Sequence, residues 1–346
     1  MTKNGTLSYD SFVKKIFIII AVALIVFFAA GTGFYLSLLK FAKLPAGEST
    51  VEKVVAVKPG EGFKSISQRL FDAGIIQSPF KFSFLARIKG YDKRVKAGEY
   101  LFSARLTPAK ILEMMVSGKV ILYKVTAPEG FTMRQIAAVV AEAGLTKAQD
   151  FLEAAGNSAR VKTAGIEADT FEGYLFPDTY YFPKEIGPEK IVDTMVRRFH
   201  SVFLPDWKKR ADELGFSVHE IVTLASIIEK ETGLPAERPV ISSVFHNRLK
   251  KRMRLESDPT VIYGIDGFNG NITRKDLAAE RPYNTYRIRG LPPGPIANPG
   301  ARALEAALFP ADTDYLYFVS KNDNSHQFST NVVDHNRAVR KYQLNR

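Results

Sequence analysis

The 346-residue chain contains no cysteine, and this absence excludes disulfides, thiolate metal sites, iron–sulfur clusters and cysteine nucleophiles. Histidine is also scarce, and the five residues present lack metal-ligand spacing. His219-Glu220 begins a zincin-like motif, but Thr223 stands where the second histidine is required. No phosphate-binding loop and no Gly-x-Ser-x-Gly elbow occur. We therefore expect no metal and no cofactor, which leaves carboxylate chemistry.

Acidic residues are outnumbered, since 48 Lys and Arg against 36 Asp and Glu give a formal net charge of +12. This balance attracts polyanions such as nucleic acid, anionic lipid or an acidic cell-wall polymer. The basic residues are scattered and match no recognised nucleic-acid motif. The net charge is therefore the only feature of the sequence that suggests a nucleic-acid binder. With 46% hydrophobic residues, the chain can bury a sizeable core, and its length suggests about two folded units.

One long segment lacks charge altogether, from Ile16 to Leu39. As a helix it would measure about 36 Å, against about 30 Å of bilayer hydrocarbon. It exceeds the roughly 7–15 apolar residues of a signal peptide, so it predicts a transmembrane helix at 16–39. A small excess of lysine before the segment places the tail 1–15 in the cytoplasm. The rest of the chain is then extracytoplasmic on the cell (inner) membrane, where nucleic acid is not an expected partner.

The remaining sequence predicts an α+β fold in two domains. Residues 40–50 lack periodicity and predict a linker, and a small α+β subdomain is expected at 51–122. The segment 123–346 predicts a larger α+β domain. Its expected helices are at 132–143, 188–203, 218–232 and 237–251.

Proline and glycine gather late in the chain, between Gly290 and Gly300. This segment cannot form a regular element, because proline lacks a backbone donor and glycine favours turns. It predicts either a surface loop or the rigid wall of a substrate groove. A weak repeat is also present, since Glu61-Gly62-Phe63 recurs as Glu129-Gly130-Phe131.

The helix expected at 218–232 is apolar and then abruptly acidic. Helical geometry places Glu229 on one shoulder of its apolar stripe and Glu231 on the other. Partial desolvation there would favour a neutral carboxylic acid that can donate a proton to a glycosidic oxygen. Spacing alone leaves the choice between these two carboxylates open, and both can also be ordinary helix-end residues.

Several long segments resemble the endolytic murein transglycosylases of the YceG-like type, and they occur in the same order. They are Phe171–Tyr180, Leu224–Thr232, Ser243–Leu249, Leu255–Gly264, Tyr283–Tyr286 and Gly290–Gly300. The family's usual layout is a membrane span, a small LysM-like unit at 51–122 here, and a catalytic domain at 123–346 here. The resemblance therefore covers nearly the whole chain.

The resemblance implies that Glu229 is the catalytic acid of a lytic transglycosylase. Such an enzyme cuts the MurNAc–GlcNAc β-1,4 bond and leaves 1,6-anhydroMurNAc ends, because the MurNAc C6 hydroxyl attacks its own anomeric carbon. Peptidoglycan glycan strands are the implied partner, and peptidoglycan synthases are implied neighbours in terminating strand growth. Amide, hydroxyl and aromatic groups are expected to line the glycan groove, namely Asn247, Asp258, Thr260, Tyr263, Asn284 and Tyr286.

The main alternative is a non-catalytic, membrane-tethered protein that binds murein. A hydrolytic mechanism is a further possibility, and it would require a second carboxylate. The candidates for that carboxylate are Glu172, Glu231 and Asp258.

Overall fold

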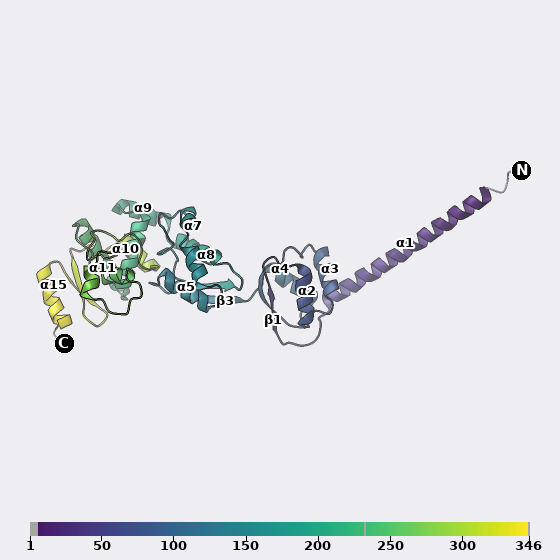
Figure 1. Cartoon of the computed structure of the whole chain (residues 1–346), viewed down its shortest axis with the longest axis horizontal. Coiled ribbons are helices and arrows are strands. Elements are labelled where there is room, and N and C mark those ends of the chain that lie inside the picture. Colours follow the sequence, from purple (N-terminus) through teal and green to yellow (C-terminus); the bar gives the residue numbers. More distant parts are fainter. Residues whose placement is uncertain (1–5, 232, 345–346) are drawn as a thin grey trace. The chain divides into compact units, whose positions relative to one another are not determined.

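The computed structural model describes residues 6–231 and 233–344. The chain divides into two compact units, a small one of Met1–Leu122 with Pro183–Glu185 and a larger one of Tyr123–Phe182 with Ile186–Arg346. In the described residues the strands form three two-stranded sheets, and helices make up most of the remaining structure (Figure 1). The predicted α+β class is confirmed.

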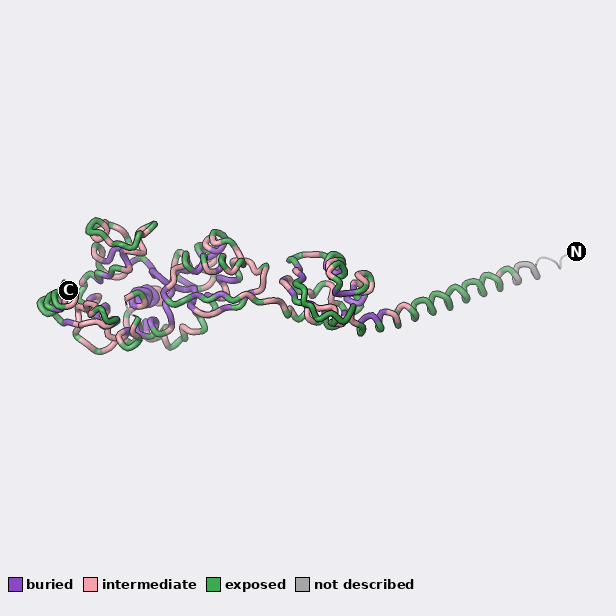
Figure 2. Tube along the Cα trace, turned by 90° about the horizontal axis from the view of Figure 1, so that it is seen from below, coloured by how far each residue is buried: buried purple, intermediate pink, exposed green. Residues whose placement is uncertain are grey.

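The first helix, α1 (Thr6–Lys43), is long and apolar enough from Phe12 onward to cross a membrane, with a mean hydropathy of 2.7. Most of it is exposed, and burial begins only near its C-terminal end (Figure 2). There Leu38, Phe41 and Ala42 join the core of the small unit. The linker predicted at 40–50 is therefore wrong for residues 40–43, because apolar partners extend the helix to Lys43. Of the predicted tail 1–15, residues 1–5 lie outside the described residues.

The small unit is a two-stranded antiparallel sheet packed against helices. After α1 its elements are β1 (Lys53–Val57), α2 (Phe63–Asp72), α3 (Pro79–Ile88), β2 (Gly98–Phe102) and α4 (Pro108–Ser117). Alternate strand residues, including Val55 and Tyr100, point into the core, while the paired Val54 and Leu101 face outward. Two helices begin at side-chain caps, because Ser78 accepts from the third residue of α3 and Thr107 does the same for α4.

The larger unit has its own core. Its elements are β3 (Leu122–Thr126), α5 (Met133–Glu142), α6 (Ala148–Ala155), α7 (Ser158–Thr163), β4 (Thr179–Pro183), α8 (Pro188–Val202), α9 (Pro205–Leu214), α10 (Val218–Glu231), α11 (Arg238–Lys250), α12 (Asp258–Tyr263), α13 (Arg274–Ala278), α14 (Ala301–Leu308), β5 (Tyr317–Ser320), β6 (His326–Ser329) and α15 (Val332–Val339). Short helical turns lie at Pro235–Glu237 and Arg340–Leu344. The four helices predicted here are confirmed as α5, α8, α10 and α11, and Thr232 lies outside the described residues.

Helix α10 occupies the middle of the larger unit and packs against α14, α11 and α12. Every residue from Ile221 to Ile228 is buried, so the helix is covered on all sides instead of along one stripe. Its polar residues are satisfied internally: the Ser226 hydroxyl donates to the Thr223 carbonyl and accepts from the Ile296 N–H. Through that second bond, α10 holds the proline- and glycine-rich segment that precedes α14.

Candidate active site

Glu229 lies in the last turn of α10 and is held by two donors. Arg238, the first residue of α11, donates from Nη2 to Oε1 at 2.9 Å, and the Gly300 N–H donates to Oε2 at 2.9 Å. The Glu229 side chain is only 5% exposed and that of Arg238 only 8%. Both donors stabilise a negative charge, and Gly300 precedes the N-terminus of α14, where the helix dipole adds to this effect.

The helical pattern predicted the burial of Glu229 but not its partner. Desolvation alone would favour the neutral acid, whereas the structure places a guanidinium beside the carboxylate. Arg238 comes after the end of α10, so the pattern of that helix could not show it.

A second carboxylate, that of Glu129, faces the same arginine and is not among the predicted site residues. Glu129 Oε2 lies 3.8 Å from Arg238 Nη2, and the Glu129 side chain is 49% exposed. A Cβ atom on Gly300 would lie 1.9 Å from Glu129 Oε1, so this carboxylate rests directly against Gly300. Two carboxylates and one cation thus meet at a point where solvent has access. The Glu-Gly-Phe repeat at 61–63 and 129–131 was the one signal that could have drawn attention to Glu129.

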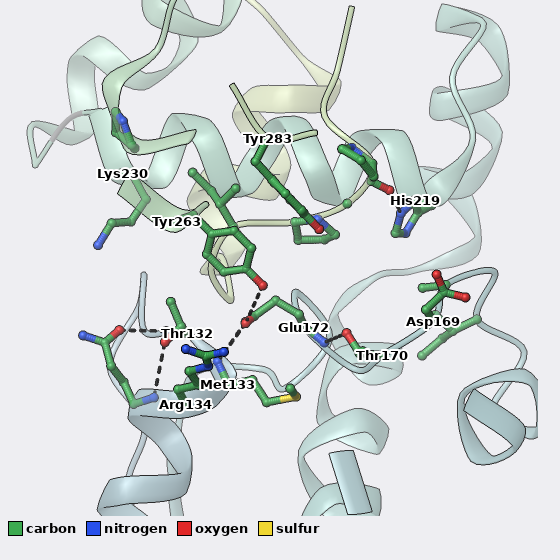
Figure 3. A pocket seen from close by; sticks show the side chains of 18 of the residues that line it. Thr132, Met133, Arg134, Asp169, Thr170, Glu172, His219, Lys230, Tyr263 and Tyr283 are labelled. Carbon is green, nitrogen blue, oxygen red and sulfur yellow. Dashed lines mark hydrogen bonds between the residues drawn. The ribbon is translucent and has the colours of Figure 1, made fainter. Parts of the chain in front are cut away.

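A deep cavity of about 1380 Å³ opens in the larger unit (Figure 3). The start of α5, both ends of α10, the end of α12 and the segment Pro293–Ile296 form its lining. Residues 294–300 are buried, so the proline- and glycine-rich segment is the wall of a cavity and the alternative of a surface loop is wrong. Lys230, the neighbour of Glu229 on α10, lines this cavity, and its Nζ donates to the Gly130 carbonyl at 3.4 Å.

Glu172 lies in the cavity wall and is 4% exposed. Its carboxylate accepts from the Met133 N–H at the start of α5 and from the Tyr263 hydroxyl, as Figure 3 shows. A third donor is Asn298 Nδ2, at 2.9 Å. Burial raises the pKa of Glu172 to about 7, and these hydrogen bonds only partly oppose the shift.

Asn298 links this carboxylate to Glu229. Besides donating to Glu172, it pairs through its backbone with Gly130 and Phe131, and its Oδ1 accepts from the Leu175 N–H. Only one residue separates it from Gly300, the backbone donor to Glu229. The position of Gly300 therefore depends on a network that Glu172 anchors.

Glu231 faces a different environment from Glu229. Its carboxylate accepts a hydrogen bond from the Ser257 hydroxyl, and burial raises its pKa to about 7. The nearby charge of Asp258 adds to that rise, whereas Arg248 opposes it. Neither Glu229 nor Glu231 is among the residues that line the cavity, but Glu229 pairs with Arg238 whereas Glu231 bonds to Ser257. The two carboxylates that the helical pattern could not separate are thus distinct in their surroundings.

The six predicted groove residues divide into three groups. Tyr263 lines the cavity, with its ring 4.8 Å from that of Tyr283. Asp258 accepts from the Tyr286 hydroxyl at 2.7 Å, and this pair lies outside the cavity lining. The other three bond to backbone groups or to a buried hydroxyl, and they are Asn247, Thr260 and Asn284.

Two of those last three side chains are buried, whereas Asn247 is half-buried. Thr260 and Asn284 are 0% and 1% exposed, and the Asn284 amide donates to three carbonyls around the end of α13. Asn247 donates to the carbonyls of Thr313 and Tyr315. Each of these amides or hydroxyls forms hydrogen bonds with backbone carbonyls or with a buried hydroxyl, so the three side chains stabilise the loops around them.

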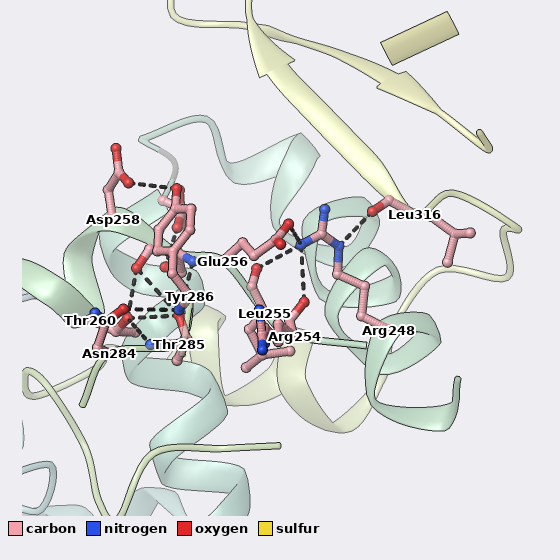
Figure 4. Close-up of polar contacts among 12 residues, drawn as sticks. Arg248, Arg254, Leu255, Glu256, Asp258, Thr260, Asn284, Thr285, Tyr286 and Leu316 are labelled. Carbon is pink, nitrogen blue, oxygen red and sulfur yellow. Dashed lines mark hydrogen bonds and ion pairs between the residues drawn. The ribbon is translucent and has the colours of Figure 1, made fainter. Parts of the chain in front are cut away.

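Arg248 lies beside these residues and organises the neighbouring segments (Figure 4). Its guanidinium donates to the carbonyls of Leu316, Arg254 and Leu255, and it also pairs with Glu256 at 3.2 Å. One side chain therefore joins the start of β5 to the segment that leads into α12. Among the described residues, no group of three or more His, Asp or Glu side chains is placed to hold a metal ion.

The larger unit thus holds two buried carboxylates, Glu172 in the cavity wall and Glu229 beside Arg238, and carboxylates of this kind suit acid–base chemistry. Residues 55–341 match the model of the YceG-like family, and the chain belongs to this family. It is 33% identical over 304 residues to the endolytic murein transglycosylase of Bacillus subtilis (strain 168), an alignment that covers 83% of this chain and 84% of that protein.

Two further comparisons agree. The chain is 30% identical over 359 residues to the endolytic murein transglycosylase of Streptococcus pneumoniae serotype 2 (strain D39), covering 94% of this chain but 65% of that longer protein. A 2.6 Å crystal structure of a protein described as YceG-like, from Listeria monocytogenes, has a TM-score of 0.58 and 35% identity. That likeness covers 84% of this chain and 99% of the solved one.

Proposed function

We propose that this protein is an endolytic transglycosylase that cuts peptidoglycan glycan strands at internal MurNAc–GlcNAc β-1,4 bonds. Its membership of the YceG-like family and the names of its relatives support the reaction and the substrate class. The observation that carries the assignment to a residue is the position of Glu229. It is a buried carboxylate between a guanidinium and a helix N-terminus, next to a solvent-facing carboxylate.

In this proposal Glu229 acts first as acid and then as base. It protonates the oxygen of the leaving GlcNAc, and Arg238 and the Gly300 N–H stabilise the carboxylate that this step leaves behind. The MurNAc C6 hydroxyl then attacks the anomeric carbon and gives its proton back to Glu229. No water is activated and no enzyme nucleophile is needed, so one carboxylate suffices and the product end is a 1,6-anhydro sugar.

The cavity is the proposed glycan groove. The faces of Tyr263 and Tyr283 offer the aromatic surface that sugar rings favour, and Thr132, Gln135 and Lys230 offer polar groups beside them. Glu129 lies between solvent and the Glu229–Arg238 pair.

The rest of the chain sets the location. Helix α1 anchors the protein in the cell (inner) membrane with the rest of the chain after α1 on the extracytoplasmic side, where peptidoglycan lies. The order β1-α2-α3-β2 of the small unit supports a LysM-like subdomain at 51–122. A membrane-held enzyme of this kind can release strands from peptidoglycan synthases and so terminate their growth.

Incubation of purified glycan strands with the full chain in detergent tests the endolytic assignment. Strand length, followed by size separation, should fall throughout the distribution with wild type and with Glu231→Gln, because internal bonds are cut. Loss of single disaccharides from strand ends would contradict the endolytic mode. Retention of uncut strands on immobilised protein would instead support a non-catalytic, membrane-tethered murein-binding protein.

A further inference from the structure

Helix α3 of the small unit carries an exposed apolar stripe. Phe80, Phe84 and Ile88 recur every fourth residue and therefore lie on one face, with 67%, 37% and 55% of their surfaces exposed. The opposite face of α3 packs into the core through Phe82, Leu85 and Ala86. An apolar helix face that the fold leaves uncovered marks a contact surface.

This stripe is continuous with the membrane-spanning candidate. The ring of Phe34 on α1 lies 5.0 Å from that of Phe84 and 6.1 Å from that of Phe80. A hydrocarbon layer of about 30 Å takes about 20 helical residues, so a span that begins at Ile16 leaves the hydrocarbon near Tyr35. Phe80 and Phe84, the two aromatic residues of the stripe, therefore lie at the level where α1 emerges.

The charges around the stripe fit anionic headgroups. Helix α3 contains no acidic residue, and Lys81 Nζ on α3 donates to the Ser37 hydroxyl on α1 at 2.9 Å. Lys40 lies about 9 Å beyond Phe34 along α1, at headgroup depth. Aromatic residues at the hydrocarbon boundary and lysines just outside it are the usual composition of a membrane interface.

We infer that Phe80, Phe84 and Ile88 are immersed in the interface of the bilayer that α1 crosses, so that lipid is the partner of this face. The inference rests on the proposed membrane span of α1. It means that α1 and α3 together hold the small unit against the headgroups, in a fixed orientation instead of on a free tether. Strands that have just left the membrane surface are then within reach of the enzyme.

Tryptophan depth measurements on the full chain test this contact. The chain has a single tryptophan, Trp207, so Trp207→Phe gives a silent background. The protein is reconstituted in phosphatidylcholine and phosphatidylglycerol vesicles whose acyl chains are brominated near the headgroup. Emission of Phe80→Trp should fall to about half or less, because interfacial side chains lie roughly 5–10 Å deep. Leu101→Trp, on the outward face of the small sheet, is the matched control and should keep its emission.

A tryptophan at position 27 separates failure of the α3 contact from failure of the membrane span. Phe27→Trp, measured in matched vesicles whose acyl chains are brominated near their ends, reports the span itself, since Phe27 is 79% exposed in the middle of α1. Quenching at position 27 without quenching at position 80 would overturn the α3 contact and leave the anchor intact. No quenching at position 27 would overturn both. Equal quenching at positions 80 and 101 would show unspecific adsorption and would also overturn the contact.

Discussion

Glu172 should make the larger unit less stable as the pH rises. Burial raises the pKa of this carboxyl from its ordinary value of 4.5 to about 7. Below pH 4.5 the carboxyl is neutral in both the folded and the unfolded chain. Between 4.5 and 7 it ionises only in the unfolded chain, so stability falls through this window and the loss is complete above it. At about 1.4 kcal/mol per tenfold change in proton affinity, the full loss is about 3 kcal/mol.

Glu172→Gln removes the charge but keeps the shape. Its amide oxygen can accept from Met133 and Asn298, and its NH₂ group can donate to the Tyr263 hydroxyl, so the contacts survive. Between pH 4.5 and pH 8, wild type should therefore lose about 3 kcal/mol more of its unfolding free energy than Glu172→Gln does.

Trp207 provides the assay, because it lies on α9 of the larger unit and packs against Phe203. Chemical unfolding of the full chain in detergent is followed by its fluorescence at several pH values. Glu231→Gln is a second, independent test, since burial also raises the pKa of Glu231 to about 7 and this variant should remove its own share of the slope. Parallel pH curves for wild type and Glu172→Gln would refute the reasoning.

Two further predictions concern the donors to Glu229. Arg238→Met should abolish strand cleavage and lower the unfolding free energy by about 3–5 kcal/mol, because it leaves a buried carboxylate unpaired; unchanged stability in the Trp207 assay would contradict this. Gly300→Ala should reduce cleavage, because its Cβ would lie 1.9 Å from Glu129 Oε1, whereas Gly233→Ala, with open space around it, should not. If the double variant Gly300→Ala with Glu129→Ala cleaves strands again, displacement of the Glu129 carboxylate is the cause of the loss. If Gly300→Ala alone cleaves as well as wild type, the predicted clash with Glu129 is wrong.

The elements that the sequence predicted well are those defined by local interactions. The predicted helix at 132–143 is α5, which has a Thr132 capping box at its start. The same holds for α10, whose apolar run is long enough to be read without knowledge of its neighbours. Helices of six to eight residues such as α7 and α12 were not predicted, because so few turns show no clear period.

The site was predictable only in part, because its chemistry depends on contacts between distant segments. A sequence pattern can place Glu229 at the end of an apolar helix, but it cannot show that Arg238 and the Gly300 N–H converge on it. For the same reason an amide that holds buried carbonyls, such as that of Asn284, looks like one that binds a sugar. The family resemblance selected Glu229 over Glu231, which the pattern alone could not do.

The central claim is that Glu229 is the acid of a transglycosylase, and mass spectrometry of digestion products tests it most directly. Full-length wild type, Glu229→Gln and the matched control Glu231→Gln are incubated with intact peptidoglycan in detergent. The full chain is used because Leu38 and Phe41 of α1 belong to the core of the small unit. We expect 1,6-anhydroMurNAc-ended fragments from wild type and Glu231→Gln, and none from Glu229→Gln. Fragments with reducing ends, or anhydro fragments still formed by Glu229→Gln, would contradict the claim.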